Sequence, residues 1–250
     1  MTRYSGIIEY IGTKYCGMQK QNNITIKTIQ GEIEKAFLKL TKYNIEINYS
    51  GRTDAMVHAK GQVISFSISE NIKINQKNII SGLNYFLKNE DIALKSIKVE
   101  KENFSPRYDA KLRTYKYFIN LEKTKPTFRK NTHFHFYKDL DLEKISIAKE
   151  YLIGKHDFSS FCKKTAGNLQ NPIRKLENIT FELLNDELIF TISAKSFLHN
   201  MVRIIIGTLL DVGTGLIYPH DIPKILDAKN RIMAGKTVPP HGLYFWEVKF

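Results

Sequence analysis

The residues from Ile45 to Phe66 read IEINYSGRTDAMVHAKGQVISF and place a polar turn between two strand-like runs. Apolar residues alternate with polar ones from Ile45 to Tyr49, and a strand pattern returns over residues 62–68. Loops held by rigid strands are where reacting groups are usually carried. The turn is therefore a candidate site with four polar side chains, Arg52, Thr53, Asp54 and His58.

A simpler interpretation of this turn stays open on the residues alone. Asp commonly caps a short helical turn, and a Ser-Gly pair such as Ser50-Gly51 commonly ends a strand. Local chemistry does not decide between a cap and a reacting carboxylate.

The string GRTDAMVHA at residues 51–59, followed by GQV at 61–63, resembles the catalytic signature GRTDxGVHx of the tRNA pseudouridine synthase A family. One position departs from that signature. Met56 stands where the family usually has Gly, a residue that often marks a positive φ. Near the N-terminus, GMQ at residues 17–19 stands where the family usually shows GWQ.

Further segments resemble family motifs in the same order along the chain. NFSPRYDA and RTYKY, within residues 103–117, are similar to F-x-A/P-R and R-x-Y-x-Y. GKHDFSSF at 154–161 resembles G-x-H-D-F-x-S-F, and KSFLHNMVRIIIG at 195–207 resembles K-A-x-x-F-L-x-x-M-V-R-x-x-V-G. PPHGLY at 239–244 is similar to A-P-x-x-G-L-Y/F, so the resemblance covers the whole chain.

The resemblance implies a two-lobed α+β fold, with helices packed on a mixed, mostly antiparallel sheet and a central active-site cleft. The order of patterns over the first 99 residues, βαββαβ, is compatible with that class. A charged connector at 100–113 contains Pro106 and is the candidate boundary. We therefore predict an N-terminal lobe over residues 1–105, carrying the Asp loop, and a C-terminal lobe over residues 106–250.

The activity that the resemblance implies is isomerisation of uridine to pseudouridine in the anticodon stem-loop of tRNA, at positions 38–40. The reaction turns an N-glycoside into a C-glycoside and involves no redox or phosphoryl step. The family resemblance implies tRNA as the partner, a homodimer, no cofactor and no metal. The spacing of the two cysteines and the lack of a long apolar run lead us to expect a cytoplasmic enzyme without a membrane partner.

The same resemblance assigns roles to individual residues. Asp54 would be the nucleophile, at the ribose C1′ or through the uracil ring, or would promote elimination at the sugar. Arg203 would pair with Asp54, and Tyr115 would lie against the base near C5. Arg52 would fill the gap left by the flipped uridine, because chemistry on a stacked base requires its extrusion. Thr53 and His58, on either side of Asp54, complete the predicted substrate-binding residues.

Charge is consistent with an RNA partner but does not establish one. The 38 Lys and Arg residues exceed the 25 Asp and Glu residues and leave a net charge of +13, which suits a polyanion. A generally basic surface would give the same excess. The apolar helix predicted over 197–212 carries Arg203 as its only Lys or Arg residue, and that side chain either pairs with a carboxylate or reaches solvent past its apolar stem.

Several other classes of protein are disfavoured. Cys16 and Cys162 form no C-x-x-C motif, which argues against a zinc ribbon and fits a reducing compartment. The loop over residues 12–26 has Gly12 and Gly17 but lacks the Lys of a phosphate loop, so we expect no nucleotide cofactor. No apolar run reaches the length of a membrane span, and no signal pattern opens the chain.

Two rival functions remain on the sequence. A non-catalytic, basic RNA-binding module would also use charge and stacking aromatics, although a carboxylate in an RNA groove repels phosphate unless it reacts. A hydrolase using Asp54 and His58 is the other rival, but the chain shows no nucleophilic Ser or Cys signature.

Overall fold

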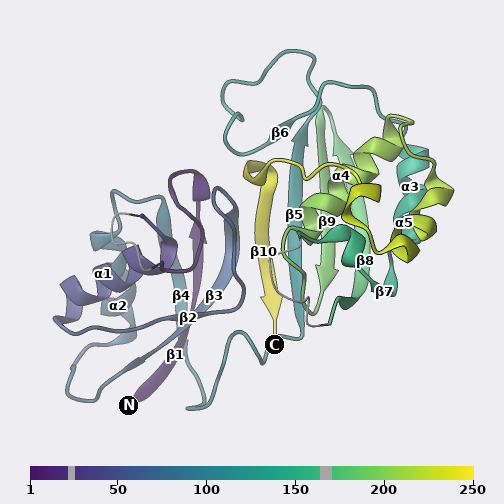
Figure 1. Ribbon diagram of the computed structural model, residues 1–250. Helices are drawn as coiled ribbons and strands as arrows, with labels where there is room; N and C mark the ends of the chain where they lie inside the picture. The colour runs from purple at the N-terminus through teal and green to yellow at the C-terminus, as the bar shows by residue number, and fades with distance from the viewer. Residues whose placement is uncertain (22–25, 164–170) are drawn as a thin grey trace. The chain divides into compact units, whose positions relative to one another are not determined.

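The computed structural model describes residues 1–21, 26–163 and 171–250, and these form two compact units (Figure 1). Unit 1 comprises Met1–Lys111 and Tyr244–Phe250, and unit 2 comprises Leu112–Leu243. Positions 22–25 of the predicted loop lie outside the described residues.

The strands of unit 1 are mostly antiparallel. Their bounds are β1 Thr2–Tyr10, β2 Asn48–Tyr49, β3 His58–Ile68, β4 Ile92–Val99 and β10 Leu243–Lys249. Strand β1 lies between β4 and β3 and is antiparallel to both. Strand β2 pairs with the middle of β3, and β10 pairs in parallel with the beginning of β3.

Two helices complete unit 1, α1 over Ile29–Thr41 and α2 over Gln76–Phe86. Thr28 caps α1, and its side-chain oxygen accepts a hydrogen bond from the Gly31 N–H at 3.2 Å. The Phe37 ring of α1 lies 4.7 Å from the Phe66 ring of β3. Because both rings are fully buried, they join helix and sheet in one apolar core.

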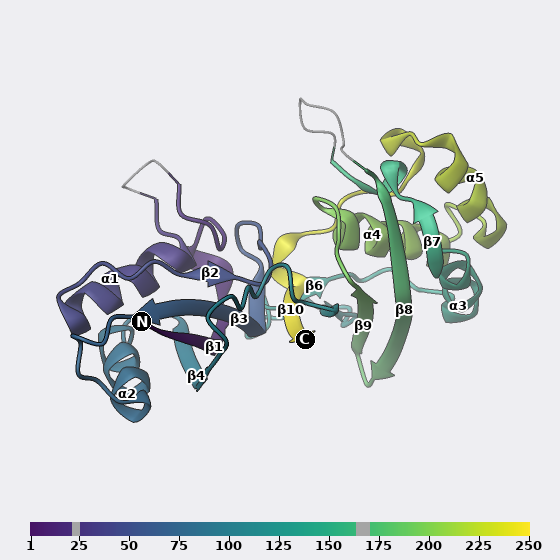
Figure 2. The ribbon, with the colours of Figure 1, turned by 90° about the horizontal axis from the view of Figure 1, so that it is seen from below.

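Unit 2 has a second, mostly antiparallel set of strands, ordered β5-β9-β8-β7. Their bounds are β5 Leu112–Asn120, β7 Gly154–Asp157, β8 Ile173–Leu184 and β9 Glu187–Ala194, with the short β6 Phe134–His135 parallel to the end of β5. The helices are α3 Leu142–Glu150, α4 Met201–Gly213 and α5 Ile222–Ala228. They lie on one side of the strands, as Figures 1 and 2 show, and α4 is almost entirely buried.

Short 3₁₀ turns connect these elements, at Gly12–Lys14, Ser159–Phe161, Pro219–Asp221, Arg231–Met233 and Pro240–Gly242. Within the described residues, no helix has both the length and the apolar character that crossing a membrane requires.

The predicted α+β class, with mostly antiparallel strands and packed helices, is confirmed in both units. The two units differ from the predicted lobes 1–105 and 106–250 in one main respect. The last strand returns to unit 1, because Tyr244 and Phe245 pair with His58 and Ala59. Such pairing between distant segments leaves no mark in the local pattern.

Two element boundaries were wrong. The strand predicted from residue 62 begins at His58, so His58 lies in β3 and not in the polar turn. The helix predicted from residue 197 begins at Met201, because Asn200 has a left-handed backbone with φ 61°. A residue in that conformation cannot continue a right-handed helix.

Candidate active site

The turn between β2 and β3 is fixed through Thr53, the residue before Asp54. The Thr53 side chain is buried, and its hydroxyl lies 2.7 Å from the Tyr10 hydroxyl of β1. The Thr53 carbonyl accepts a hydrogen bond from the Met18 N–H at 3.1 Å. Thr53 is therefore held on both sides, by a buried phenol and by the segment that follows β1.

That segment approaches the turn so closely that only glycine fits at one position. Gly17 has a φ of +96°, and a Cβ there would lie 2.4 Å from the Thr53 carbonyl oxygen. On the other side of the turn, the Met56 N–H donates to the Tyr15 carbonyl at 3.2 Å. Residues 15–18 thus brace the turn through backbone contacts at both ends.

Met56 has a φ of 65°, in the left-handed region, and the Val57 N–H donates to the Asp54 carbonyl at 3.2 Å. This is the position at which the resembling family usually has Gly. The turn therefore keeps the conformation that Gly would favour, although a side chain in this region costs about 1–2 kcal/mol. Asp54 is consequently presented at the start of a tight, hydrogen-bonded turn.

Asp54 is half-buried and lines a small, open pocket with a volume of about 230 Å³. Arg52 lines the same pocket, so the predicted nucleophile and its neighbouring cation share one space. The lining residues are Cys16, Gln19, Gln21, Arg52, Thr53, Asp54 and Ala55. Carboxylate, guanidinium and amide groups in one pocket suit a polar, planar ligand such as a nucleobase.

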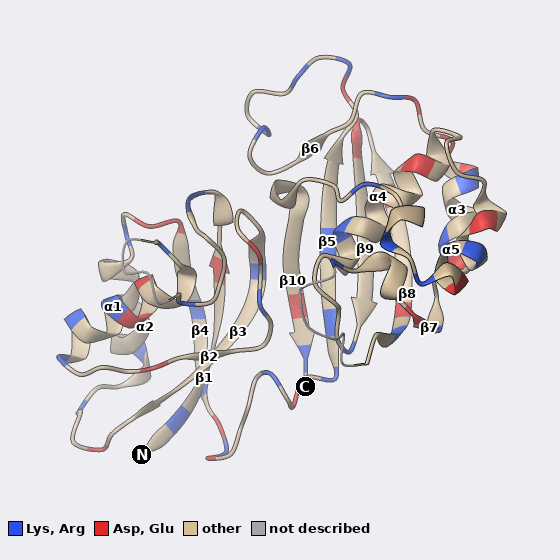
Figure 3. Ribbon diagram, in the orientation of Figure 1, with Lys and Arg blue, Asp and Glu red and all other residues tan. Residues whose placement is uncertain are grey.

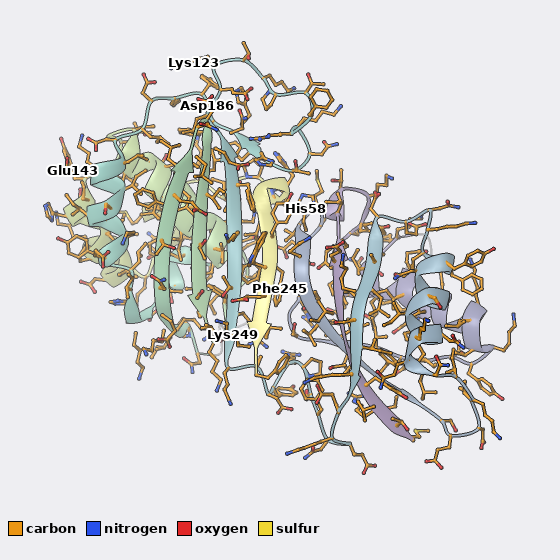
Figure 4. All side chains as sticks on the ribbon, turned by 180° about the vertical axis from the view of Figure 1, so that it is seen from behind. His58, Lys123, Glu143, Asp186, Phe245 and Lys249 are labelled. Carbon is orange, nitrogen blue, oxygen red and sulfur yellow. The ribbon has the colours of Figure 1, made fainter. Side chains whose placement is uncertain are left out.

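The His58 side chain lies inside the protein, whereas Arg52 and Asp54 line the pocket. It is completely buried, its Nδ1 accepts a hydrogen bond from the Gly12 N–H at 2.8 Å, and its ring lies 4.6 Å from that of Tyr244. Figure 4 shows His58 at the beginning of β3, next to the strand β10 that carries Phe245. These contacts join the turn to β10. Because the His58 side chain is completely buried, the structure does not support its predicted contact with the substrate.

Tyr115 and Tyr117 lie two residues apart on β5 and point to the same face of the unit 2 strands. Tyr115 is buried, and its ring meets that of Phe197 edge to face at 5.1 Å. Tyr117 donates its hydroxyl to the Pro239 carbonyl at 2.8 Å, and burial raises its pKa well above the ordinary value. Tyr117 therefore has a structural role, because its hydroxyl is already bonded to the backbone inside unit 2.

Arg203 lies in the first turn of α4 and is half-buried. Its Nε donates to the Val238 carbonyl at 2.8 Å, and its Nη1 donates to the Asn200 side-chain oxygen at 3.0 Å. Asn200 precedes the helix and does not cap it with its side chain. The amide of Asn200 instead orients the guanidinium, a role that the sequence motif gave no reason to expect.

Residues 234–238 lie across α4 and carry the carbonyl that holds Arg203. A Cβ on Gly207 would lie 1.8 Å from the Lys236 carbonyl oxygen, so this contact requires glycine in the middle of the helix. The Gly235 N–H donates to the Thr208 hydroxyl at 2.9 Å. The isolated Gly207 in an otherwise apolar helix was the available sequence signal of this close approach.

Asp54, Arg52, Thr53 and His58 belong to unit 1, whereas Tyr115 and Arg203 belong to unit 2. The structure therefore brings Arg52, Thr53 and Asp54 together at one pocket, whereas His58 is buried in β3, and the predicted pair of Asp54 with Arg203 stays a prediction. Across residues 1–21, 26–163 and 171–250, no group of three or more His, Cys, Asp or Glu residues could hold a metal ion.

Comparison with known proteins decides the family. The sequence model described as tRNA pseudouridine synthase matches residues 7–109 and 148–250. The chain belongs to this family. As a member of the tRNA pseudouridine synthase family, it has the expected α+β fold. It is also an isomerase, as the resemblance of its GRTD motif implied. The segment 110–147, which includes Tyr115, lies between the two matched regions.

Relatives named tRNA pseudouridine synthase A align with this synthase along nearly its whole length. The protein of Caldicellulosiruptor saccharolyticus is 43% identical over 97% of this chain and 97% of its own. That of Neorickettsia sennetsu is 41% identical over 99% and 100%, respectively. The protein named tRNA pseudouridine synthase A 1 of Bacillus cereus is 40% identical over 100% and 99%.

Proposed function

We propose that this synthase isomerises uridine to pseudouridine in the anticodon stem-loop of tRNA, at positions 38–40, with Asp54 as the reacting carboxylate. The observation that carries the proposal is the placement of Asp54: half-buried, in a polar pocket, on a turn that Thr53 and Gly17 hold rigid. A carboxylate that served only as a cap would not need a pocket beside it.

The reaction breaks the bond from uracil N1 to ribose C1′ and forms a bond from C5 to C1′. The proton lost from C5 is balanced by the proton gained at N1, so no other reactant is required. Asp54 supplies the group that stabilises the sugar or uracil while the two are separated, by attack at C1′, by attack on the ring or by promoting elimination. Holding the detached uracil is the task of the pocket.

The other site residues have subordinate roles in this proposal. Arg203, oriented by Asn200 and Val238, would pair with Asp54 and balance its charge. Tyr115 would lie against the base near C5, and Arg52 would occupy the gap that the extruded uridine leaves in the RNA. His58 would support the turn from β10 and would not touch the base.

We also propose that the synthase acts as a homodimer in the cytoplasm, which the family resemblance supports. The net charge of +13 suits the phosphates of a folded RNA.

The test is to incubate the protein with unmodified tRNA transcripts and to map pseudouridine by nucleotide position. Pseudouridine confined to positions 38–40 is the expected result. Tight binding of tRNA without any pseudouridine would instead identify a non-catalytic RNA-binding module, and pseudouridine at other positions only would refute the assigned target.

A further inference from the structure

The segment between β5 and β6, residues 121–133, carries a fully exposed aromatic side chain. Phe128 has a relative exposure of 102%, the largest value among the exposed hydrophobic residues described. The neighbouring positions 127 and 129–131 are exposed as well. We call residues 121–133 the Phe128 loop. Covering this ring with a partner would remove its apolar surface from water, which is favourable.

Hydrogen bonds anchor the base of the Phe128 loop to the rest of unit 2. The Leu121 N–H donates to the Asp186 carbonyl at 2.7 Å, and the His135 Nε2 lies 2.8 Å from the Glu122 carbonyl. Figure 4 shows Lys123 and Asp186 close to one end of unit 2. The anchoring means that the loop presents Phe128 from a defined support.

The tip of the loop is a turn closed on the Arg129 carbonyl. That oxygen accepts hydrogen bonds from the Thr132 N–H at 3.1 Å and the His133 N–H at 2.9 Å. The Glu187 carboxylate of β9 forms an ion pair with the Arg129 guanidinium at 3.4 Å and a hydrogen bond with the His133 imidazole. The two contacts tie Arg129, which follows Phe128, and His133 to the sheet. Because the turn is already held in place, little conformational entropy is lost if Phe128 binds a ligand.

Positive charge surrounds the exposed ring. Residues 121–139 contain five Lys and Arg residues against two Asp and Glu residues, and Figure 3 shows the blue segments on this loop. Lys123 pairs with Asp139 at 2.8 Å. Lys125 and Lys130, by contrast, form no ion pair with any residue that the structure describes, and both are exposed.

An exposed aromatic ring between cations has the chemistry of a site for unpaired nucleotides. The ring stacks on a base, while the cations meet the phosphates on either side. We propose that the Phe128 loop binds the substrate RNA, with Phe128 stacked on an unpaired base and with Lys125 and Lys130 on the flanking phosphates. A second copy of this chain fits less well, because two such loops facing each other would repel.

The position of the loop indicates which part of the RNA it reaches. Tyr115 and the loop belong to the same unit, and β5 runs from Tyr115 to Asn120, where the loop begins. Five residues of strand span about 17 Å. Single-stranded RNA covers such a distance in a few nucleotides, so the stacked base lies in the anticodon loop near the target. This step rests on the proposed function, which puts the target uridine beside Tyr115.

The loop also lies outside the two regions that match the family's sequence model, 7–109 and 148–250. Its contact with RNA is therefore an addition to the catalytic turn, and it can be removed without touching Asp54. That separation makes the inference testable by binding alone.

The experiment measures the dissociation constants of two RNAs for the full-length protein. One is a hairpin with the anticodon stem and loop, in which positions 38–40 are cytidine so that no reaction intervenes. The other is a continuous duplex of equal length without unpaired bases. The variants are Phe128→Ala, Phe128→Trp and the double variant of Lys125→Ala with Lys130→Ala. Tyr85→Ala is the matched control, since Tyr85 is an exposed ring beside Lys88 in unit 1.

We expect Phe128→Ala to weaken hairpin binding by about fivefold to a hundredfold, the range for one stacked base, and to leave duplex binding unchanged. Phe128→Trp should retain hairpin binding, and Tyr85→Ala should change neither RNA. The double lysine variant should weaken both RNAs and lower the salt dependence of binding.

Equal effects of Phe128→Ala on hairpin and duplex, or none on the hairpin, would overturn the inference. A dimer that dissociates on Phe128→Ala in sedimentation, with hairpin affinity unchanged, would show that a second copy covers the ring instead. If wild-type protein formed no pseudouridine in tRNA but Phe128→Ala still weakened the hairpin alone, the proposed reaction would fail and this RNA contact would stand.

Discussion

The Tyr10 hydroxyl and the Thr53 hydroxyl lie 2.7 Å apart, inside unit 1 and directly behind the turn that presents Asp54. Tyr10 is 3% exposed and Thr53 7%, so the hydrogen bond is shielded from water. Burial raises the pKa of Tyr10 above its ordinary value, which keeps the phenol protonated in the physiological range. A neutral hydroxyl pair thus fixes the backbone next to Asp54, the proposed reacting carboxylate.

Tyr10→Phe should lower kcat more than it lowers RNA affinity. It removes one buried hydrogen bond and leaves the Thr53 hydroxyl without that partner, at a cost of about 1–2 kcal/mol in stability. Since Thr53 then holds the turn less firmly, we expect kcat to fall about tenfold with the dissociation constant of tRNA within twofold.

Ser5→Ala is the control for this prediction, because it removes a buried hydroxyl bonded to Glu100 at 2.8 Å in the same unit, away from the turn. It should cost similar stability and preserve kcat. If both variants lose kcat equally, the effect reports general loosening of unit 1 and not the support of the turn.

Met56→Gly should stabilise the protein. A non-glycine residue at φ 65° carries about 1–2 kcal/mol of strain, which glycine removes. The greater conformational freedom of glycine in the unfolded chain offsets part of that gain in stability. We expect a net gain of up to about 1 kcal/mol, or about 2–4 °C in the unfolding midpoint, with turnover within twofold of wild type. Lys42→Gly, at φ 67° after helix α1, is the matched control for strain relief away from the site.

A lower midpoint for Met56→Gly than for wild type would mean that contacts of the Met56 side chain outweigh its backbone strain. Calorimetry of the two variants beside wild type gives the answer.

Much of the fold followed from local patterns, and the exceptions have identifiable causes. Strand β4 and helix α5 each end at a clear turn signal in the sequence. The Asn185-Asp186 pair marks the turn between β8 and β9, and Asn185 takes φ 54°, as tight turns require. Strand β3 began earlier than predicted because its first residues pair with β10, nearly two hundred residues away in sequence.

The site was less accessible to sequence reasoning than the fold. The GRTD motif pointed to Asp54, and the resemblance pointed to Arg203 and Tyr115, and their roles stay predictions. The supporting contacts of Thr53 with Tyr10 and of Arg203 with Asn200 join residues whose types are common in cores and at helix ends. No pattern of spacing distinguishes such supports, because their role depends on tertiary geometry.

Asn200 provides a second test of support, at Arg203. Asn200→Gly keeps the left-handed backbone at φ 61° but removes the oxygen that accepts from Arg203, whereas Asn200→Asp keeps an acceptor. We expect kcat to fall about tenfold for Asn200→Gly and to remain within threefold of wild type for Asn200→Asp, with KM for tRNA little changed in both.

If Asn200 serves only the backbone turn before α4, Asn200→Gly will match wild type in kcat and exceed it in unfolding midpoint. Kinetics and thermal unfolding on the same preparations therefore separate orientation of Arg203 from shaping of the chain.

Acid should destabilise unit 2 through two half-buried histidines. Burial lowers the pKa of His133 below its ordinary 6.5, although Glu187 opposes the shift, and burial lowers the pKa of His241 as well. The unfolded chain then binds more protons than the folded one just below pH 6.5. Their contribution to stability is fully present above pH 6.5 and is lost as the pH falls through the lowered values.

Urea unfolding at pH 8.0 and pH 5.5 measures this effect. The free energy of unfolding should be lower at pH 5.5, and the difference should shrink in the His133→Gln and His241→Gln variants, which cannot take up the proton. An equal pH dependence in wild type and both variants would assign the acid sensitivity to other groups.

The most direct test of the proposed chemistry is single-turnover pseudouridine formation by Asp54→Asn, measured beside tRNA binding. Asn is nearly isosteric with Asp but lacks the charge and the nucleophilic oxygen. We predict a rate at least about a thousandfold below wild type, with the dissociation constant of tRNA within about tenfold, because phosphate contacts are unaffected. A variant that forms pseudouridine at near the wild-type rate would contradict the role of Asp54.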